Sequence, residues 1–149
     1  MKKKSLYLLL FLIITIFVVL FFQNDNEVQG FQKIKIGGEV IKVEVVDTSS
    51  TRAQGLSGRE SLAKDQGMLF VFDTPGNYSF WMKDMNFAID IIWIDETGKI
   101  VYIKENATPE SYPEGFGPNE KTSKYVLEVF SGFVDSYDLE VGDSVNLSY

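Results

Sequence analysis

The stretch GMLFVFDTPGNYSFWMKDMNFAIDIIWID, at residues 67–95, decides the fold of this chain. It contains three apolar runs, both tryptophans and three of the four methionines. The run at 67–72 is apolar on successive positions, which predicts a strand buried on both faces. Two further strands are predicted at 78–83 and 89–95, and the turn residues DTPGN at 73–77 separate the first strand from the second. We therefore expect the core of the domain to form around this stretch.

Further strand patterns lie on both sides of this centre. Residues 31–36 and 40–46 form a predicted hairpin around Gly37-Gly38, a dipeptide typical of two-residue hairpin turns. In the second of these strands apolar and charged residues alternate, as expected for a sheet with one wet face. Later strands are predicted, in chain order, at 100–104, 125–130 and 144–149.

Residues 47–62 differ from their surroundings, because they are rich in Ser, Thr, Gly and Arg. Thr48 or Ser49 is a suitable helix cap, and Gly55 is a suitable helix end. A second capped turn is predicted to begin at Ser57. We expect one or two short turns of helix here, within a long excursion from the sheet.

Strands outnumber helices in this pattern, and turns recur at short intervals. The sequence therefore predicts a mainly β fold: a single compact domain of β-sandwich or jelly-roll type with one or two short helices. One connection, at 106–122, is long and contains three of the four prolines. Ordered loops of this length are often lids or binding loops.

Residues 1–22 form a predicted membrane segment ahead of the β domain. Three lysines at 2–4 precede seventeen residues, 6–22, with only two polar side chains. A helix of this length spans roughly 26 Å, just short of the ~30 Å hydrocarbon core of a bilayer. The basic residues before it place the amino end in the cytoplasm and the domain outside. We expect an uncleaved anchor, with a cleaved signal peptide as the alternative, then a linker at 23–30 and the β domain at 31–149.

Charge and missing residue types exclude several classes of function. Residues 31–149 hold 11 Lys and Arg against 19 Asp and Glu, a net charge of −8, which argues against nucleic acid as a partner. The chain contains neither Cys nor His. Disulfides, zinc sites built on thiolate or imidazole, Ser-His-Asp triads and Cys nucleophiles are therefore excluded. No metal site and no cofactor is expected.

Asp90 is the first candidate functional residue. On the strand 89–95 it shares a face with Ile92 and Ile94, because side chains alternate along a strand. A buried carboxylate must be paired or hydrogen-bonded, since an isolated buried charge costs several kcal/mol. Asp90 either accepts backbone N–H groups at the strand entrance, a structural role, or faces a pocket with a basic partner.

Trp81, Lys83, Asp84 and Asn86 form a second group, at the end of a predicted strand. An aromatic face beside amide and carboxylate groups suits the recognition of sugars. The alternative is that Trp81 belongs to the core and that the charged pair is a solvated turn.

Arg52 and Arg59 are the third candidate group. Two arginines in a Gly-rich excursion are typical of anion binding. In a domain with many carboxylates they are equally suited to tying the loop to Asp or Glu. Asp84 and Asp90 are candidates for a carboxylate pair, which does acid–base work in glycoside hydrolysis, although acidic residues are common in this chain.

Six motifs together resemble the domain of unknown function (DUF) 192 family. In order they are RAQGLSGRESL at 52–62, GMLFVF at 67–72, FWMKDM at 80–85, IDIIWID at 89–95, YVLEV at 125–129 and VGDSV at 141–145. The resemblance covers residues 40–149 and implies a compact jelly-roll-like β domain, often exported. It implies no activity and no catalytic residues. The family has Met where this chain has Ser57, which puts a packing role for that position in doubt.

The expected function is that of a ligand-binding module, favoured over an enzyme, held at the outer side of the membrane by the N-terminal helix. The expected ligand belongs to the envelope, and a glycan is the favoured class. The basis is the β class, the group at 81–86 and the aromatic residues Tyr112 and Phe116 of the long loop. Two alternatives stay open: a carboxylate-based hydrolase using Asp84 and Asp90, and a protein-interaction factor at the membrane surface.

Overall fold

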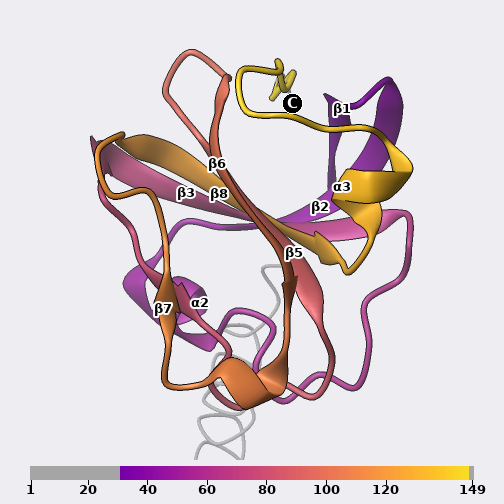
Figure 1. Cartoon of the computed structure of the whole chain (residues 1–149), viewed down its shortest axis with the longest axis vertical. Coiled ribbons are helices and arrows are strands. Elements are labelled where there is room, and N and C mark those ends of the chain that lie inside the picture. Colours follow the sequence, from indigo (N-terminus) through magenta and orange to yellow (C-terminus); the bar gives the residue numbers. More distant parts are fainter. Residues whose placement is uncertain (1–30, 148–149) are drawn as a thin grey trace, which may run out of the picture.

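The computed structural model describes residues 31–147, which form eight strands and three short helices (Figure 1). The strands are β1 (Gln32–Ile36), β2 (Glu39–Val46), β3 (Gln66–Gly76), β4 (Phe80–Trp81), β5 (Ile89–Ile94), β6 (Ile100–Ala107), β7 (Gly115–Phe116) and β8 (Ser123–Phe130). The helices are α2 (Ser49–Gln54), the 3-10 helix η1 (Pro109–Ser111) and α3 (Phe133–Ser136). The predicted membrane segment and linker lie outside the described residues.

Six strands form one mixed sheet in the order β1-β2-β3-β8-β5-β6, and β4 pairs with β7 in a separate ribbon. β2 and β3 are parallel, whereas the other neighbours in the large sheet are antiparallel. A parallel pair needs a long crossover, and here residues 47–65, with α2, provide it. The antiparallel β1–β2 pair needs only a tight turn. Gly37 and Gly38 form it with φ of 58° and 84°, values that favour glycine.

Both faces of the large sheet are covered, so the domain has two apolar cores. The first core lies under α3 and the C-terminal segment, and Leu127 and Val129 of β8 point into it. The second core lies under the chain that contains α2, β4 and β7, and Val126 of β8 points into it. Figure 1 shows α2 and α3 on opposite sides of the sheet. Burial of both faces explains why the central strands are continuous apolar runs.

Trp93 is the centre of the second core. It is fully buried, and its indole N–H donates to the carbonyl oxygen of Tyr78 over 2.8 Å. Its ring packs edge-on against Phe80 and Tyr102, with centroids 5.8 and 5.1 Å away. Trp93 therefore fixes the position of the chain that leads into β4.

Asp90 fastens α3 to the sheet. Its Oδ1 accepts from the backbone N–H of Asn106 over 2.8 Å, and its Oδ2 accepts from those of Gly132 and Val134, each over 3.0 Å. The carboxylate is buried, on the face of β5 that meets the first core. Asp90 thus has the structural role that was one of its two expected roles: its carboxylate accepts backbone N–H groups.

The predicted mainly β class is confirmed, with a mixed six-stranded sheet and two short α-helices. The sandwich or jelly-roll arrangement is not shown, because the larger set of strands forms one sheet. The hairpin around Gly37-Gly38 is confirmed, and so is the helix that begins after Thr48, whose side chain caps Thr51 N. Among residues 31–147, no helix has the length and apolar composition that crossing a bilayer requires.

Three local predictions are wrong. The second helical turn expected from Ser57 does not form, because residues 57–62 contain a hydrogen-bonded turn but no helix. β3 continues through most of the expected turn at 73–77, because an irregularity between Val71 and Gly76 lets it pair with β8 again. The described part of the strand expected at 144–149 makes only isolated bridges, at Ser144 and Asn146.

Replacing Asp90 should cost far more stability than replacing an exposed carboxylate. Asp90→Ala would leave three backbone N–H groups without their acceptor, so we expect the free energy of unfolding to fall by roughly 3 kcal/mol. Asp135→Ala, at an exposed position of α3, is the matched control and should change it by less than about 0.5 kcal/mol. Urea unfolding followed by tryptophan fluorescence measures both; equal losses would contradict the role given to Asp90.

Candidate functional site

A cavity of about 300 Å³ opens at the edge of the second core, between α2, β3, β4 and β8. We call it the aromatic pocket. Its aromatic lining residues are Phe70, Phe72, Tyr78, Phe80 and Trp81. Ligand pockets are mostly apolar, with a few polar groups that fix orientation. The polar groups that line this cavity therefore decide what it can bind.

The walls of the aromatic pocket are packed against one another. Phe72 and Tyr78 are stacked, with centroids 3.5 Å apart and an interplanar angle of 10°. Phe70 and Phe80 meet edge to face at 4.8 Å. The guanidinium of Arg52 lies over the ring of Phe72, 5.0 Å from its centroid. Since each ring is held by a neighbour, the cavity is formed before any ligand arrives.

The wall contributed by α2 is positioned by its ends. Thr48 and Thr51 form a reciprocal capping box at the start of the helix. Gly55 ends it with φ of 50°, and a Cβ there would lie 3.3 Å from the ring of Phe70. Glycine therefore lets the backbone after α2 approach the aromatic side chain closely.

Glu128 is the buried acidic group of the aromatic pocket. It lies on β8 between Met68 of β3 and Ile91 of β5, and its side chain faces the second core. It is only 6% exposed, and its Oε2 atom has no hydrogen-bond partner among the described residues. Burial raises the pKa of Glu128 to about 8, and the charge of Arg59 opposes this rise only in part. At neutral pH Glu128 is therefore protonated and can donate a hydrogen bond.

Arg59 does not neutralise Glu128 because it is engaged elsewhere. Its guanidinium forms an ion pair of 2.7 Å with Glu44. Glu44 lies opposite Met68 on β2, in the same row across the sheet as Glu128. Asn86 donates to the carbonyl oxygen of Arg59 over 2.9 Å and so holds the loop in place. In this row the carboxylate of Glu44 is paired with an arginine, whereas Oε2 of Glu128 has no partner among the described residues.

An exposed polar surface adjoins the aromatic pocket. This outer shelf is formed by Ala53, Gln54, Ser57, Gly58, Trp81, Lys83 and Asp84. Trp81 is 60% exposed and contacts Tyr112, which is 45% exposed, edge to face at 6.1 Å. Trp81 lines both the shelf and the pocket. The two concavities therefore adjoin each other at Trp81.

The predicted site residues divide into three groups. Arg52 and Trp81 line the aromatic pocket, and Lys83 and Asp84 join Trp81 on the outer shelf. Arg59 and Asn86 support the loop behind it. Asp90 lies on the opposite face of the sheet.

Asp84 and Asp90, the proposed carboxylate pair, are not brought together. Asp84 is exposed on the outer shelf, with φ of 56°, and its carbonyl oxygen accepts from Gly58 N over 2.8 Å. Asp90 is buried beneath α3 and lines neither the shelf nor the aromatic pocket. No shared concavity holds both among the described residues.

Glu128 is not among the site residues predicted from the sequence. In YVLEVF it is a carboxylic acid inside an apolar run, the same pattern that singled out Asp90. The signal that could have identified Glu128 is therefore present in the sequence. What the sequence lacks is the partner of each residue, because backbone N–H groups from α3 satisfy Asp90 and nothing in the described chain satisfies Glu128 Oε2.

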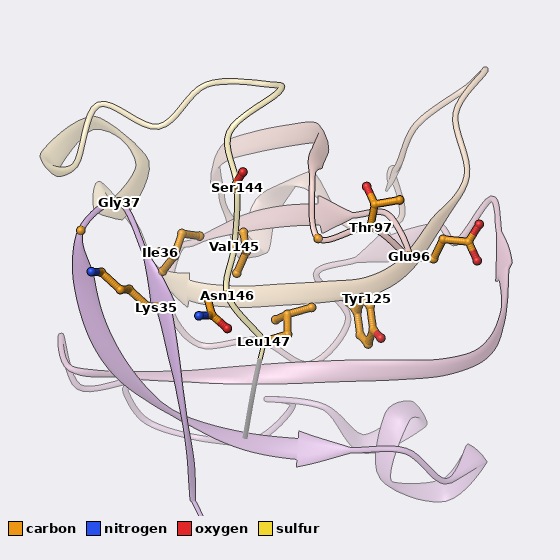
Figure 2. Close-up of a pocket in the computed structure, with 12 residues that line it drawn as sticks. Lys35, Ile36, Gly37, Glu96, Thr97, Tyr125, Ser144, Val145, Asn146 and Leu147 are labelled. Atoms are coloured by element: carbon orange, nitrogen blue, oxygen red, sulfur yellow. The ribbon is translucent and has the colours of Figure 1, made fainter.

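A larger cavity, of about 450 Å³, lies beside the C-terminal segment (Figure 2). Lys35, Glu96, Thr97 and Tyr125 line it with residues 144–147, which cross between β1 and the turn after β5. Three buried side-chain atoms of residues 31–147 have no hydrogen-bond partner, and none of them belongs to a residue that lines this cavity. Its chemistry is that of ordinary surface, so size alone does not make it the site.

The mixed sheet and the aromatic pocket define a small β domain with a preformed cavity. The family model DUF192, described as an uncharacterized ACR, matches residues 31–147, and the chain belongs to this family. Its resemblance to that family in the sequence is thereby confirmed.

Two crystal structures are similar to this one. A protein of Sinorhizobium meliloti, provisionally described as a transcription regulator, is 31% identical with a TM-score of 0.71, over 81% of this chain and 97% of that one. A protein of unknown function from Novosphingobium aromaticivorans is 29% identical with a TM-score of 0.70, over 81% and 89% of the two chains. No curated protein matches the chain.

Glu128 should make the stability of the domain depend on pH in a defined direction. The ordinary pKa of the carboxyl is 4.5, and the folded chain raises it to about 8. Between these values the unfolded chain releases the proton while the folded chain retains it. The free energy of unfolding should therefore fall as pH rises between these values, by roughly 1 kcal/mol per pH unit from this group.

Glu128→Gln should remove this contribution. Relative to the parent, the variant should gain stability progressively from pH 4.5 to pH 8 and gain little more above that. Glu105→Gln, at an exposed position of β6, should follow the parent at every pH. Chemical denaturation at each pH measures the differences, and a Glu128→Gln difference that does not vary with pH would show that the carboxyl titrates normally.

Proposed function

We propose that this chain is a ligand-binding module whose site is the aromatic pocket with the adjoining outer shelf. The observation that carries the proposal is the carboxyl of Glu128, buried at the pocket with an oxygen that lacks a partner. A buried polar group without a hydrogen bond costs roughly 1–3 kcal/mol. A ligand that forms this bond recovers the cost, which is a reason for the group to be there.

A glycan is the ligand class that the outer shelf favours. Trp81 and Tyr112 are exposed although they are large and apolar, and each is held by contact with the other. Exposed aromatic faces bind the apolar faces of sugar rings, while nearby polar groups bind the hydroxyls. Lys83 and Asp84 supply such groups next to Trp81.

The proposed location is the outer side of the membrane. The apolar residues 6–22 and the lysines before them are the basis of this proposal. An envelope glycan would then lie within reach of a domain that is anchored close to the bilayer, or secreted after cleavage of the segment.

The other candidates have less support. A hydrolase built on Asp84 and Asp90 would need both carboxyls beside one scissile bond, and they line no common cavity. A role in transcription, as described for the Sinorhizobium meliloti protein, is disfavoured here. Binding to DNA depends on positive charge, whereas residues 31–149 carry a net charge of −8. A protein partner at the membrane surface stays a prediction, for which a pull-down with the full chain is the test.

Replacing Trp81 should weaken glycan binding. Isothermal titration calorimetry of the full chain with soluble cell-wall glycan fragments should show saturable binding. Trp81→Ala should lower the affinity by roughly tenfold, since an aromatic contact contributes about 0.5–1.5 kcal/mol beyond its buried area. Val141→Ala, at a 52% exposed residue that lines neither concavity, should bind as the parent does. Absence of binding by every fragment would refute a glycan as the ligand.

A further inference from the structure

We infer that the ligand is a glycan with an N-acetylated sugar, and that its acetamido group enters the aromatic pocket while the sugar ring stays on the outer shelf. In this arrangement the acetamido carbonyl oxygen accepts a hydrogen bond from the carboxyl of Glu128, and the methyl group packs against the aromatic walls. The inference rests on the proposed function and specifies the chemical group that the pocket selects.

The first argument is the shortage of polar partners in the aromatic pocket. The Ser57 hydroxyl donates to Lys83 O over 2.9 Å, and the Tyr78 hydroxyl donates to Thr74 O over 2.6 Å. The Gln54 amide donates to Ser57 O over 3.0 Å. A sugar ring inside the pocket would bury several hydroxyls that these groups cannot all satisfy. An acetamido group brings one carbonyl, one N–H and a methyl group, and so matches a cavity with aromatic walls and one buried donor.

The second argument concerns the two arginines beside the pocket, both of which are engaged by groups of the domain. The Arg52 guanidinium donates to the carbonyl oxygens of Asp47 and Val71, the latter over 2.8 Å, and lies over Phe72. The Arg59 guanidinium is paired with Glu44. The same two positive charges beside the cavity disfavour an ammonium ligand. The electrostatics therefore argue against a cationic ligand.

The third argument is the protonation of Glu128. Two charged groups lie in the same row across the sheet as Glu128, Glu44 on β2 and Lys104 on β6, each two strands away. Arg59, on the loop after α2, is paired with Glu44, and Arg52 and Tyr78 line the pocket with Glu128. Burial outweighs the effect of Arg59 and raises the pKa of Glu128. A protonated carboxyl is a donor, and a carbonyl oxygen is its natural acceptor.

The position of Trp81 separates the ring from its substituent. Trp81 borders both concavities, and its contact with Tyr112 holds two exposed aromatic side chains together on the outer side. A sugar ring that contacts this pair can direct an equatorial substituent past Trp81 into the pocket. Specificity then arises from the substituent, while the ring contact supplies affinity common to many sugars.

Three trisaccharides that share one linkage and differ in one substituent test the inference on the full chain in detergent; two are neutral and one is positively charged. The probes are the β-1,4 trimers of N-acetylglucosamine, glucose and glucosamine, titrated by calorimetry. We expect the N-acetylated trimer to bind at least about tenfold more tightly than the other two, as expected for one buried hydrogen bond with packing of a methyl group.

The outcomes separate the inference from the function on which it rests. Equal affinities for the glucose and N-acetylglucosamine trimers would overturn the acetamido assignment and leave a glycan-binding function in place. Preference for the glucosamine trimer would overturn it in favour of a cationic ligand. Failure of all three trimers to bind, when other envelope fragments do bind, would overturn the acetamido assignment alone; failure of every fragment would overturn both.

Variants of Glu128 test the hydrogen bond itself. The affinity of the parent for the N-acetylglucosamine trimer should fall by about tenfold or more between pH 6 and pH 9.5, because an ionised carboxylate cannot donate. Glu128→Gln keeps a donor, so it should bind at both pH values with nearly equal affinity. Glu128→Leu should bind weakly at both. If the parent and Glu128→Gln have the same pH profile, or if Glu128→Leu binds as the parent does, the role given to Glu128 is wrong.

Discussion

A strand in the middle of a sheet that is covered on both faces must send alternate side chains into opposite cores, and β8 has that place here. Leu127 and Val129 therefore belong to the first core, whereas Val126 and Glu128 face the second. Glu128 is therefore nearly buried, and it lines the cavity at the edge of the second core. β3 and β5 pair with β8 on either side. The alternation of side chains along β8 therefore sets which residues of these neighbouring strands lie beside Glu128 at the pocket.

Asp90 and Glu128 show how differently the fold treats two buried acids. They lie on neighbouring strands, and their side chains point to opposite faces of the sheet. Asp90 accepts hydrogen bonds from backbone N–H groups at the start of α3, so it fastens this helix to the sheet. Glu128 lies among apolar side chains with no such donors, so burial favours its neutral form. Only the second acid is left with bonding capacity for another molecule.

Much of the fold could be predicted from local patterns. The glycine pair predicted the first hairpin, Thr48 and Gly55 predicted the bounds of α2, and the alternation of 89–95 placed Asp90 on the face of the first core. These features depend on residues close in sequence. The extension of β3 through its expected turn could not be predicted, because it depends on pairing with β8 some fifty residues later.

The sequence by itself determined that the domain is mainly β, that His and Cys chemistry is absent, and that a few polar residues sit in apolar strands. Only the tertiary structure decided which of those residues meet. The parallel crossover carries α2 over the second core and places Arg52 beside Phe72. The long loop then brings Tyr112 to Trp81 and completes the rim beside the pocket that contains Glu128. The physical reason is that burial and unpaired hydrogen-bonding capacity are properties of an assembled surface, which no local pattern contains.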